Sequence, residues 1–272
     1  MAIPLTKIVA TLGPASGSKA AIKSLVAKGV NVFRLNLSHG THEIVRKWIH
    51  WIREVEEEHH SFVGILLDLQ GPKIRVGKFK EGSIHVKRGQ RLTFTTEKKI
   101  GDETLVPVQY PRFHEEVTKG GKIFLDDGKL SGVVRQVSGQ RAEVEILTGG
   151  ILSDHKGINL PDSKITADPI TSKDKADLKF GVQEGVDMVA LSFTGCAKDV
   201  RRLKSLIKKY GSPEIEVIAK IERKQAVDNL EEIVEEADGV MVARGDLGIE
   251  ISLTEVPIVQ QRILREGAKH SK

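Results

Sequence analysis

One stretch, Ile218–Ile251, constrains the fold of this chain more than any other. It contains an apolar strand that carries Lys220 and Glu222, an amphipathic helix over about Gln225–Ala237, and a second apolar strand that ends in the letters ARGD. This order of strand, helix and strand predicts two parallel strands joined by a crossover helix. Charged residues at the carboxyl ends of such strands are typical of active sites in parallel α/β barrels.

The charged residues of the first strand share one side of it. Lys220 and Glu222 are two residues apart, so they project to the same face, whereas Ala219 and Ile221 project to the other. A charge on a strand that helices cover needs a partner or a ligand, because burying it alone is costly. We therefore expect this end of the strand to form part of a functional site.

The second strand supplies another carboxylate. We expect Arg244 and Asp246 to share one face with Val240 and Val242. Glu222 and Asp246 offer hard oxygen ligands of the kind that Mg²⁺ and Mn²⁺ prefer, with a lysine close by. The alternative is an internal ion pair that only neutralises the lysine. Spacing alone does not choose between these alternatives.

An earlier strand carries a row of polar residues. In the sequence VNVFRLNLSHG, Arg34, Asn36 and Ser38 lie on one face and the apolar residues between them on the other. Solvent exposure would explain this row in an antiparallel sheet. A helix precedes the strand, however, and another is predicted over His42–His59. In a parallel sheet covered by helices, a polar row requires a ligand or an internal network.

The pattern changes after a third apolar strand, Phe62–Leu69, which delivers Asp68 at its end. Short alternating strands punctuated by glycines follow, without helical periodicity. We predict a small all-β domain at residues 73–158, inserted between the first part (1–72) and second part (159–272) of a barrel domain. An insertion at this point lies over the active-site end of the barrel.

The α/β pattern then resumes. We expect a helix capped by Ser172, a strand in VDMVALSF, a helix over Ala197–Tyr210 and a final helix over about Val256–Lys272. Ser16 is the expected cap of the first helix. The fold class is therefore α/β: a parallel (β/α)8 TIM-type barrel that stops after about six βα units, where a closed barrel has eight.

Composition narrows the function. The net charge of the 272 residues is +5, but cations and anions are interspersed and aromatic residues make up only 4%. We expect small anionic substrates and no nucleic acid, because neither a basic stripe nor a stacking platform is visible. Cys196 is the only cysteine, which we expect at a helix start, so a reducing compartment is indicated. We find no signal-like or membrane-spanning stretch and expect a cytoplasmic protein.

The motifs of the chain occur in a familiar order. They are TKIVATLGPAS, VFRLNLSHG, DLQGPKIR, LDDGKL, KGINLP, ALSF, IAKIE and MVARGDLGIEI, and they span the chain from Thr6 to its end. The chain closely resembles the pyruvate kinase family in these motifs. The resemblance implies a glycolytic phosphotransferase that moves the phosphoryl group of phosphoenolpyruvate to ADP, giving pyruvate and ATP.

The resemblance also implies residue roles. Lys220 and Arg34 would be catalytic, with Lys220 neutralising charge on the transferring phosphoryl group and Arg34 binding it. The implied substrate-binding residues are Arg34, Lys220, Gly245, Asp246 and Ser192. The implied ligands of Mg²⁺ or Mn²⁺ are Glu222 and Asp246. The implied nucleotide-binding residues are Asn36, His39, Arg75 and Lys156. The implied ligands of a monovalent cation are Asn36, Ser38, Asp68 and the carbonyl of Leu69.

One departure from the family concerns this monovalent cation. Many members have GPEIR where this chain has GPKIR, and a threonine where this chain has Leu69. We expect the ammonium of Lys73 to lie near Asp68 and Ser38 and to replace K⁺ there. The alternative is that Lys73 points to solvent and K⁺ binds as usual.

A second departure is length. The family continues with a seventh strand that carries a substrate-contacting threonine, an eighth strand and a C-terminal domain used in effector binding and subunit contacts. We expect an N-terminal fragment of a homotetrameric enzyme, with little activity and with its first and sixth strands as unpaired edges. Two other hypotheses are a non-catalytic fragment that binds nucleotide or a partner, and a metal-dependent lyase acting on a pyruvate enolate.

Overall fold

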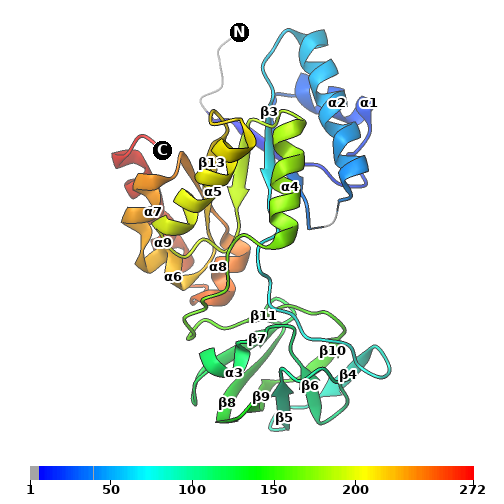
Figure 1. Cartoon of the computed structure of the whole chain (residues 1–272), viewed down its shortest axis with the longest axis vertical. Helices are drawn as coiled ribbons and strands as arrows, with labels where there is room; N and C mark the ends of the chain where they lie inside the picture. The colour runs from blue at the N-terminus through cyan, green and yellow to red at the C-terminus, as the bar shows by residue number, and fades with distance from the viewer. Residues whose placement is uncertain (1–5, 39) are drawn as a thin grey trace.

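The computed structural model describes residues 6–38 and 40–272. These residues form a parallel sheet flanked by helices and a second, separate β region (Figure 1). Between residues 6 and 272, leaving out 39, no helix is both long and apolar enough to cross a membrane.

A six-stranded sheet organises the first region, and its strand order is β1-β2-β3-β12-β13-β14. The strands are β1 (Ile8–Thr11), β2 (Val30–Asn36), β3 (Gly64–Asp68), β12 (Met188–Leu191), β13 (Glu216–Ile221) and β14 (Gly239–Val242). All neighbouring pairs are parallel. This confirms the predicted class of a truncated α/β barrel, and β1 and β14 end the sheet of the described residues, as expected.

Helices cover this sheet and join its strands. They are α1 (Lys19–Ala27), α2 (His42–His59), α4 (Ser172–Gln183), α5 (Ala197–Tyr210), α6 (Lys224–Asp228), α7 (Leu230–Glu236), α8 (Arg244–Glu250) and α9 (Val256–Lys269). The expected bounds of α2 and α5 are confirmed, with Cys196 as the residue before α5. The helix expected over Gln225–Ala237 is interrupted at Asn229, where the backbone leaves helical geometry.

Two predicted helix caps are wrong by one or two residues. Ser18, not Ser16, accepts a hydrogen bond from the first turn of α1, because the chain makes a further turn before the helix begins. Ser16 closes that turn instead and accepts the Gly13 N–H at 3.1 Å. Thr171, not Ser172, caps α4 and forms a reciprocal capping box with Asp174.

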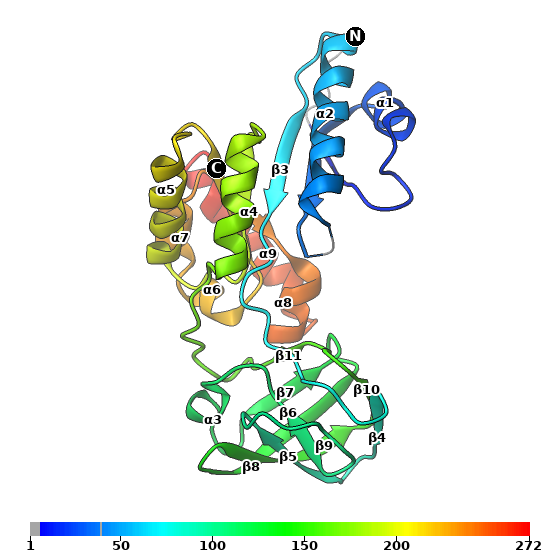
Figure 2. The same ribbon diagram turned by 45° about the vertical axis from the view of Figure 1, so that its right-hand side comes forward.

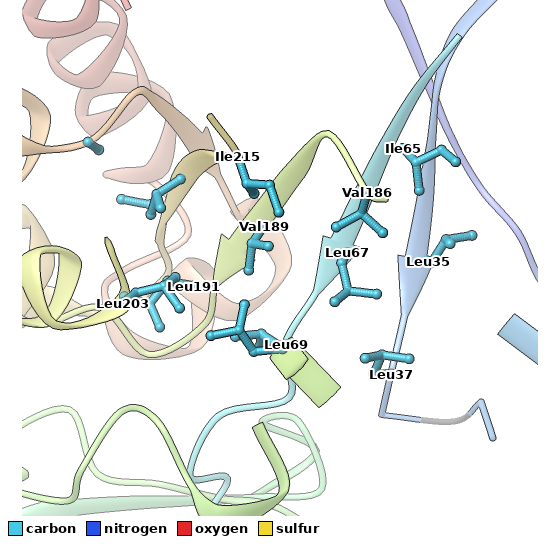
Figure 3. Close-up of a cluster of buried hydrophobic side chains, with 14 of the residues drawn as sticks. Leu35, Leu37, Ile65, Leu67, Leu69, Val186, Val189, Leu191, Leu203 and Ile215 are labelled. Atoms are coloured by element: carbon cyan, nitrogen blue, oxygen red, sulfur yellow. The ribbon is translucent and has the colours of Figure 1, made fainter. Parts of the chain in front are cut away.

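The apolar core lies between the sheet and its helices. Leu35, Leu67 and Leu191 alternate along their strands with the polar residues predicted to be functional, and their side chains meet in one cluster (Figure 3). Helix α4 packs so closely on β3 that a Cβ at Gly181 would come within 2.4 Å of Leu67 Cδ2. Packing of this density fixes the strand positions and hence the polar residues on their other face.

The second region has its own core and lies between β3 and α4 in the chain. It comprises β4 (Ser83–Val86), β5 (Arg91–Thr95), β6 (Leu105–Pro107), α3 (Phe113–Glu116), β7 (Lys122–Leu125), β8 (Leu130–Ser138), β9 (Arg141–Thr148), β10 (Gly150–Ser153) and β11 (Ile158–Asn159). Its buried residues run from Ile74 to Leu160. The short helix α3 was not expected, and the domain limits at 73 and 158 stay a prediction.

The β region lies at the carboxyl end of the parallel strands. In Figures 1 and 2 the arrowhead of β3 points toward it, and the chain crosses to it directly after that strand. The polar ends of the parallel strands therefore face a second wall built by the β region.

Candidate active site

A cavity of about 330 Å³ lies where the parallel strands meet the β region. Its barrel side is lined by polar residues at the ends of β2, β3, β12 and β13 and by the first turn of α8. The described lining residues are Arg34, Asn36, Ser38, Asp68, Leu69, Gln70, Lys73, Arg75, Asp126, Asp127, Lys156, Gly157, Ser192, Phe193, Lys220, Glu222 and Asp246. The structure thus brings together the predicted site residues, except that Gly245 is not in the lining and His39 lies outside the described residues.

Lys220 is the centre of the buried part of this cavity and is only 7% exposed. Its Nζ donates to Ser192 Oγ at 2.7 Å, and lies 3.2 Å from Glu222 Oε2 and 3.4 Å from Asp68 Oδ1. Burial acts to lower the pKa of Lys220, but the two carboxylates outweigh it and raise the pKa above its ordinary value. Lys220 is therefore an ammonium at neutral pH.

Asp68 connects this lysine to Arg34. Arg34 Nε donates to Asp68 Oδ2 at 2.7 Å, and Arg34 Nη2 pairs with the same oxygen. Ser192 Oγ lies within 3.3 Å of the other carboxylate oxygen, Oδ1. Asp68 therefore holds the arginine of β2 and the lysine of β13 at the same end of the sheet.

Glu222 is held from the neighbouring strand. Its Oε1 accepts the Phe193 N–H at 2.6 Å, and Phe193 has a left-handed backbone with φ of 57°. Burial raises the pKa of the Glu222 carboxyl, which is 3% exposed. A non-glycine residue with positive φ is unusual, and here it turns its N–H toward the site. Phe193 was not among the predicted site residues, because nothing in its residue type indicates a positive φ.

The second carboxylate, Asp246, does not lie on a strand. Strand β14 ends at Val242 and helix α8 begins at Arg244, so the expectation that Arg244 and Asp246 share a strand face is wrong. Val240 and Val242 pack against the apolar core. The charged residues do not continue their strand face, because the chain leaves the strand at Ala243 and starts a helix. Asp246 is exposed in the first turn of α8 and lines the cavity.

The β region supplies the opposite wall. Lys156 Nζ lies 2.8 Å from Asp126 Oδ1, and Lys129 Nζ lies 2.9 Å from Asp126 Oδ2. Hydrogen bonds from these two lysines lower the pKa of Asp126. Asp126 and Asp127 both have positive φ, in the turn between β7 and β8. No role was predicted for them, although two acids before a glycine are a recognisable turn signal.

Lys73 does not lie against Asp68 or Ser38 as expected. Its Nζ is 3.2 Å from Asp127 Oδ1, on the β region. The side chain runs over Gly157, where an added Cβ would come within 2.7 Å of Lys73 Cε. Arg34 and Lys220 already neutralise Asp68, so the carboxylate offers Lys73 little attraction. The idea that Lys73 replaces K⁺ loses its geometric basis.

The other rim residues make local contacts. Arg75 Nη1 donates to the carbonyl of His155 at 2.9 Å, and Asn36 Oδ1 accepts the Ser38 N–H at 2.9 Å. The Leu69 carbonyl accepts Ser192 Oγ at 2.7 Å.

Within 6–38 and 40–272 no group of three or more His, Cys, Asp or Glu residues could hold a metal ion. Glu222 and Asp246 both line the cavity, and among the described residues no third side chain of these four types groups with them.

Comparisons with known proteins show which sequences and folds this chain is similar to. The family profile described as pyruvate kinase, barrel domain, matches residues 3–272. The chain is 40% identical over 262 residues to the pyruvate kinase of Clostridium perfringens (strain 13 / Type A), which covers 96% of this chain and 55% of that protein. It is 42% identical over 263 residues to the pyruvate kinase of Geobacillus stearothermophilus, with 96% and 45% covered.

A solved structure shows the same fold. The crystal structure of a pyruvate kinase from Cryptosporidium parvum matches with a TM-score of 0.93 and 34% sequence identity, over 96% of this chain and 55% of that one. The chain thus spans about half the length of the relatives that it matches. From the family profile, the sequence identities and the shared fold, we conclude that this chain belongs to the pyruvate kinase family.

Proposed function

We propose that the protein transfers the phosphoryl group of phosphoenolpyruvate to ADP, giving pyruvate and ATP. The observation that carries this proposal is the buried Lys220 ammonium, held 3.2 Å from Glu222 at the wall of a cavity that also contains Arg34. Phosphoryl transfer depends mainly on positioning and on electrostatic stabilisation of the moving charge. A preorganised ammonium beside an arginine supplies both.

The residues present fit a divalent cation. Glu222 and Asp246 both line the cavity, and Mg²⁺ typically binds one or two carboxylates and completes its shell with water and substrate oxygens. Mg²⁺ or Mn²⁺ bound there would act as a Lewis acid on substrate oxygens. Phe193 keeps Glu222 oriented through its N–H.

The basic residues that line the cavity then have distinct proposed roles. Arg34 is anchored to Asp68 through Nε and one terminal nitrogen, which leaves donors of its planar guanidinium for the phosphoryl group. Lys220 lies deeper and neutralises negative charge as the phosphoryl group moves. Arg75 and Lys156, on the opposite wall, are proposed to bind the nucleotide together with Asn36 and His39. Ser192 and the backbone of Gly245 and Asp246 complete the proposed substrate contacts.

The monovalent cation remains a prediction. Asn36, Ser38, Asp68 and Leu69 all line the one cavity, and their oxygens keep lone pairs beyond the hydrogen bonds that they accept. K⁺ is proposed at these oxygens. A cytoplasmic location and a homotetrameric assembly are likewise proposals; the first rests on the family's role in glycolysis and the second on the resemblance to the family.

The direct test is release of pyruvate from phosphoenolpyruvate and ADP by the protein expressed from its complete gene. We expect turnover that requires Mg²⁺ or Mn²⁺ and stops when a chelator is added. Nucleotide binding without turnover would support the non-catalytic hypothesis instead. Turnover of phosphoenolpyruvate that does not depend on ADP would also contradict the proposal.

Binding of Mn²⁺ alone tests the metal site without relying on activity. We expect Glu222→Gln to weaken Mn²⁺ binding at least tenfold, measured by electron paramagnetic resonance, because the loss of even an indirect metal partner commonly costs 10–100-fold. Glu232→Gln is the control, since this carboxylate accepts the Ala197 N–H outside the cavity. Equal affinities in the two variants would refute the assignment of Glu222.

A further inference from the structure

A buried carboxylate outside the cavity has no part in the proposed mechanism. Asp177 lies in α4 and is 3% exposed. Its Oδ1 lies 2.7 Å from His42 Nε2, and its Oδ2 accepts Lys173 Nζ at 2.5 Å. A buried carboxylate is retained only with such partners, so the position of Asp177 is tied to those of both side chains.

Lys173 extends this pairing to the site. Its Nζ also donates to the carbonyl of Leu37 at 2.9 Å. Leu37 stands between Asn36 and Ser38, and its N–H donates to the Asp68 carbonyl at 3.1 Å. The lysine therefore holds the backbone at the point where two cavity-lining residues leave β2.

His42 holds the other side of the same connection. It is the first residue of α2, and its ring stacks on Phe180 of α4 with centroids 4.2 Å apart and planes 5° apart. One carboxylate thus reaches the end of β2 through Lys173 and the start of α2 through His42. Leu37, just after β2, and His42, at the start of α2, are thus held by the same residue of α4.

We propose that Asp177 is a positioning residue, which through Lys173 holds the backbone of Leu37 and through His42 holds the start of α2, and which thereby presents Asn36 and Ser38 to the cavity. The proposal rests on the proposed function for its kinetic consequence but not for its structural one. Asp177 touches no reacting atom. Replacing Asp177 should therefore act by displacing residues that bind ligands. A displacement of about 1 Å can lower the activity of an enzyme by up to about 10²-fold.

The experiment compares Asp177→Asn with Glu184→Gln. Glu184 pairs with Arg46 at 2.8 Å between the same two helices, but away from the cavity, so it controls for loss of an interhelical ion pair. We expect Asp177→Asn to speed hydrogen–deuterium exchange of a peptide spanning residues 36–45 by about fivefold or more. We expect KM for ADP to rise about tenfold, with kcat changed less than threefold. Glu184→Gln should leave both measurements unchanged.

A second variant keeps the inference falsifiable if Asp177→Asn does not fold. Lys173→Met removes the donor to the Leu37 carbonyl, and because its side chain is half-exposed the substitution opens no cavity in the core. It should show the same faster exchange and the same rise in KM. Unchanged exchange in whichever variants fold would overturn the proposal, as would an equal fall in kcat for all substrates. Failure of the parent protein to release pyruvate would refute the proposed function alone, since the exchange measurement stands without turnover.

Discussion

The two walls of the cavity differ in burial and in how their charges are held. On the barrel side, the Lys220 and Glu222 side chains are 9% and 4% exposed and are enclosed by neighbouring strands. On the side of the β region, the Lys156 and Asp127 side chains are 38% and 61% exposed. Charges in a low-dielectric environment interact far more strongly than charges beside water. The barrel side is therefore suited to stabilising a transition state, and the β side to attracting and releasing a charged ligand.

The difference has a cause in the architecture. The barrel side is formed by adjacent strands of one sheet, and their packing holds each side chain within a narrow range of positions. The β side is reached through two linkers, after β3 and after β11. A polar contact between the β region and α8 is made by Asn159 Nδ2, which donates to Glu250 Oε1 at 3.1 Å. Substitutions on the two walls should therefore have effects on activity that differ in size and in their sensitivity to salt.

The largest effect is expected for Lys220→Met. Loss of one preorganised electrostatic group commonly costs on the order of 10²–10³ in kcat, and affinity for Mn²⁺ should change much less. Lys204→Met, which breaks a part-buried ion pair with Asp238 away from the cavity, is the control. A loss of less than tenfold in a coupled assay of pyruvate release would mean that the two walls do not differ as described.

A smaller effect is expected for Lys156→Met on the other wall. Exposed charge pairs contribute little, so we expect KM for ADP to rise about threefold to tenfold and the difference to shrink at high salt. Lys129→Met is a matched control, because Lys129 binds the same carboxylate of Asp126 without lining the cavity. An effect as large as that of Lys220→Met, or an equal effect in the control, would break the comparison.

Glu250 offers a test of burial through pH. Burial raises the pKa of Glu250 above its ordinary value of 4.5, although the Asn159 amide and Arg223 oppose this. The folded state then keeps a proton that the unfolded state has lost, so the free energy of unfolding falls as pH rises from 4.5 through the raised pKa. The fall approaches about 1.4 kcal/mol per pH unit inside that window. The unfolding free energy of Glu250→Gln, measured with urea, should not show this fall.

Glu97, a partly exposed carboxylate of the β region, should give a pH dependence of stability with the opposite sign. Hydrogen bonds from Arg141 and Lys99 lower the pKa of Glu97 from 4.5 to about 2. Its contribution to stability is present above pH 4.5 and is lost as pH falls toward 2. Unfolding free energies of Glu97→Gln and the parent should therefore converge at low pH. If the contributions of Glu250 and Glu97 to the unfolding free energy changed with pH in the same direction, a difference in burial would not explain their behaviour.

The smallest effect is expected for Lys73→Gln. Its ammonium lies against Asp127 rather than Asp68, so the K⁺ concentration that gives half-maximal activity should stay within about twofold of the parent value. Activity is measured against added KCl at constant ionic strength. A new tenfold requirement for K⁺ in the variant would show that Lys73 had taken the place of the cation after all.

Much of the architecture could be predicted from local patterns. The bounds of α2 and α5 follow from apolar periodicity, and the polar row of Arg34, Asn36 and Ser38 opposite an apolar face is confirmed by burial. The helix after β13 was harder, since its interruption at Asn229 has no proline or glycine to mark it. The cap of α4 was missed because Thr171 and Ser172 are both good caps by residue type.

The sequence by itself determined which residue types stand at the strand ends, because side-chain alternation and backbone sterics act over a few residues. It did not determine their partners. Asp68 pairs with Arg34 and Lys220, and Lys73 pairs with Asp127. Lys173, which pairs with Asp177, donates to the Leu37 carbonyl. These choices depend on distances between segments far apart in the chain, and a charge pairs with whichever opposite charge packing brings within reach. Only the tertiary structure decides that.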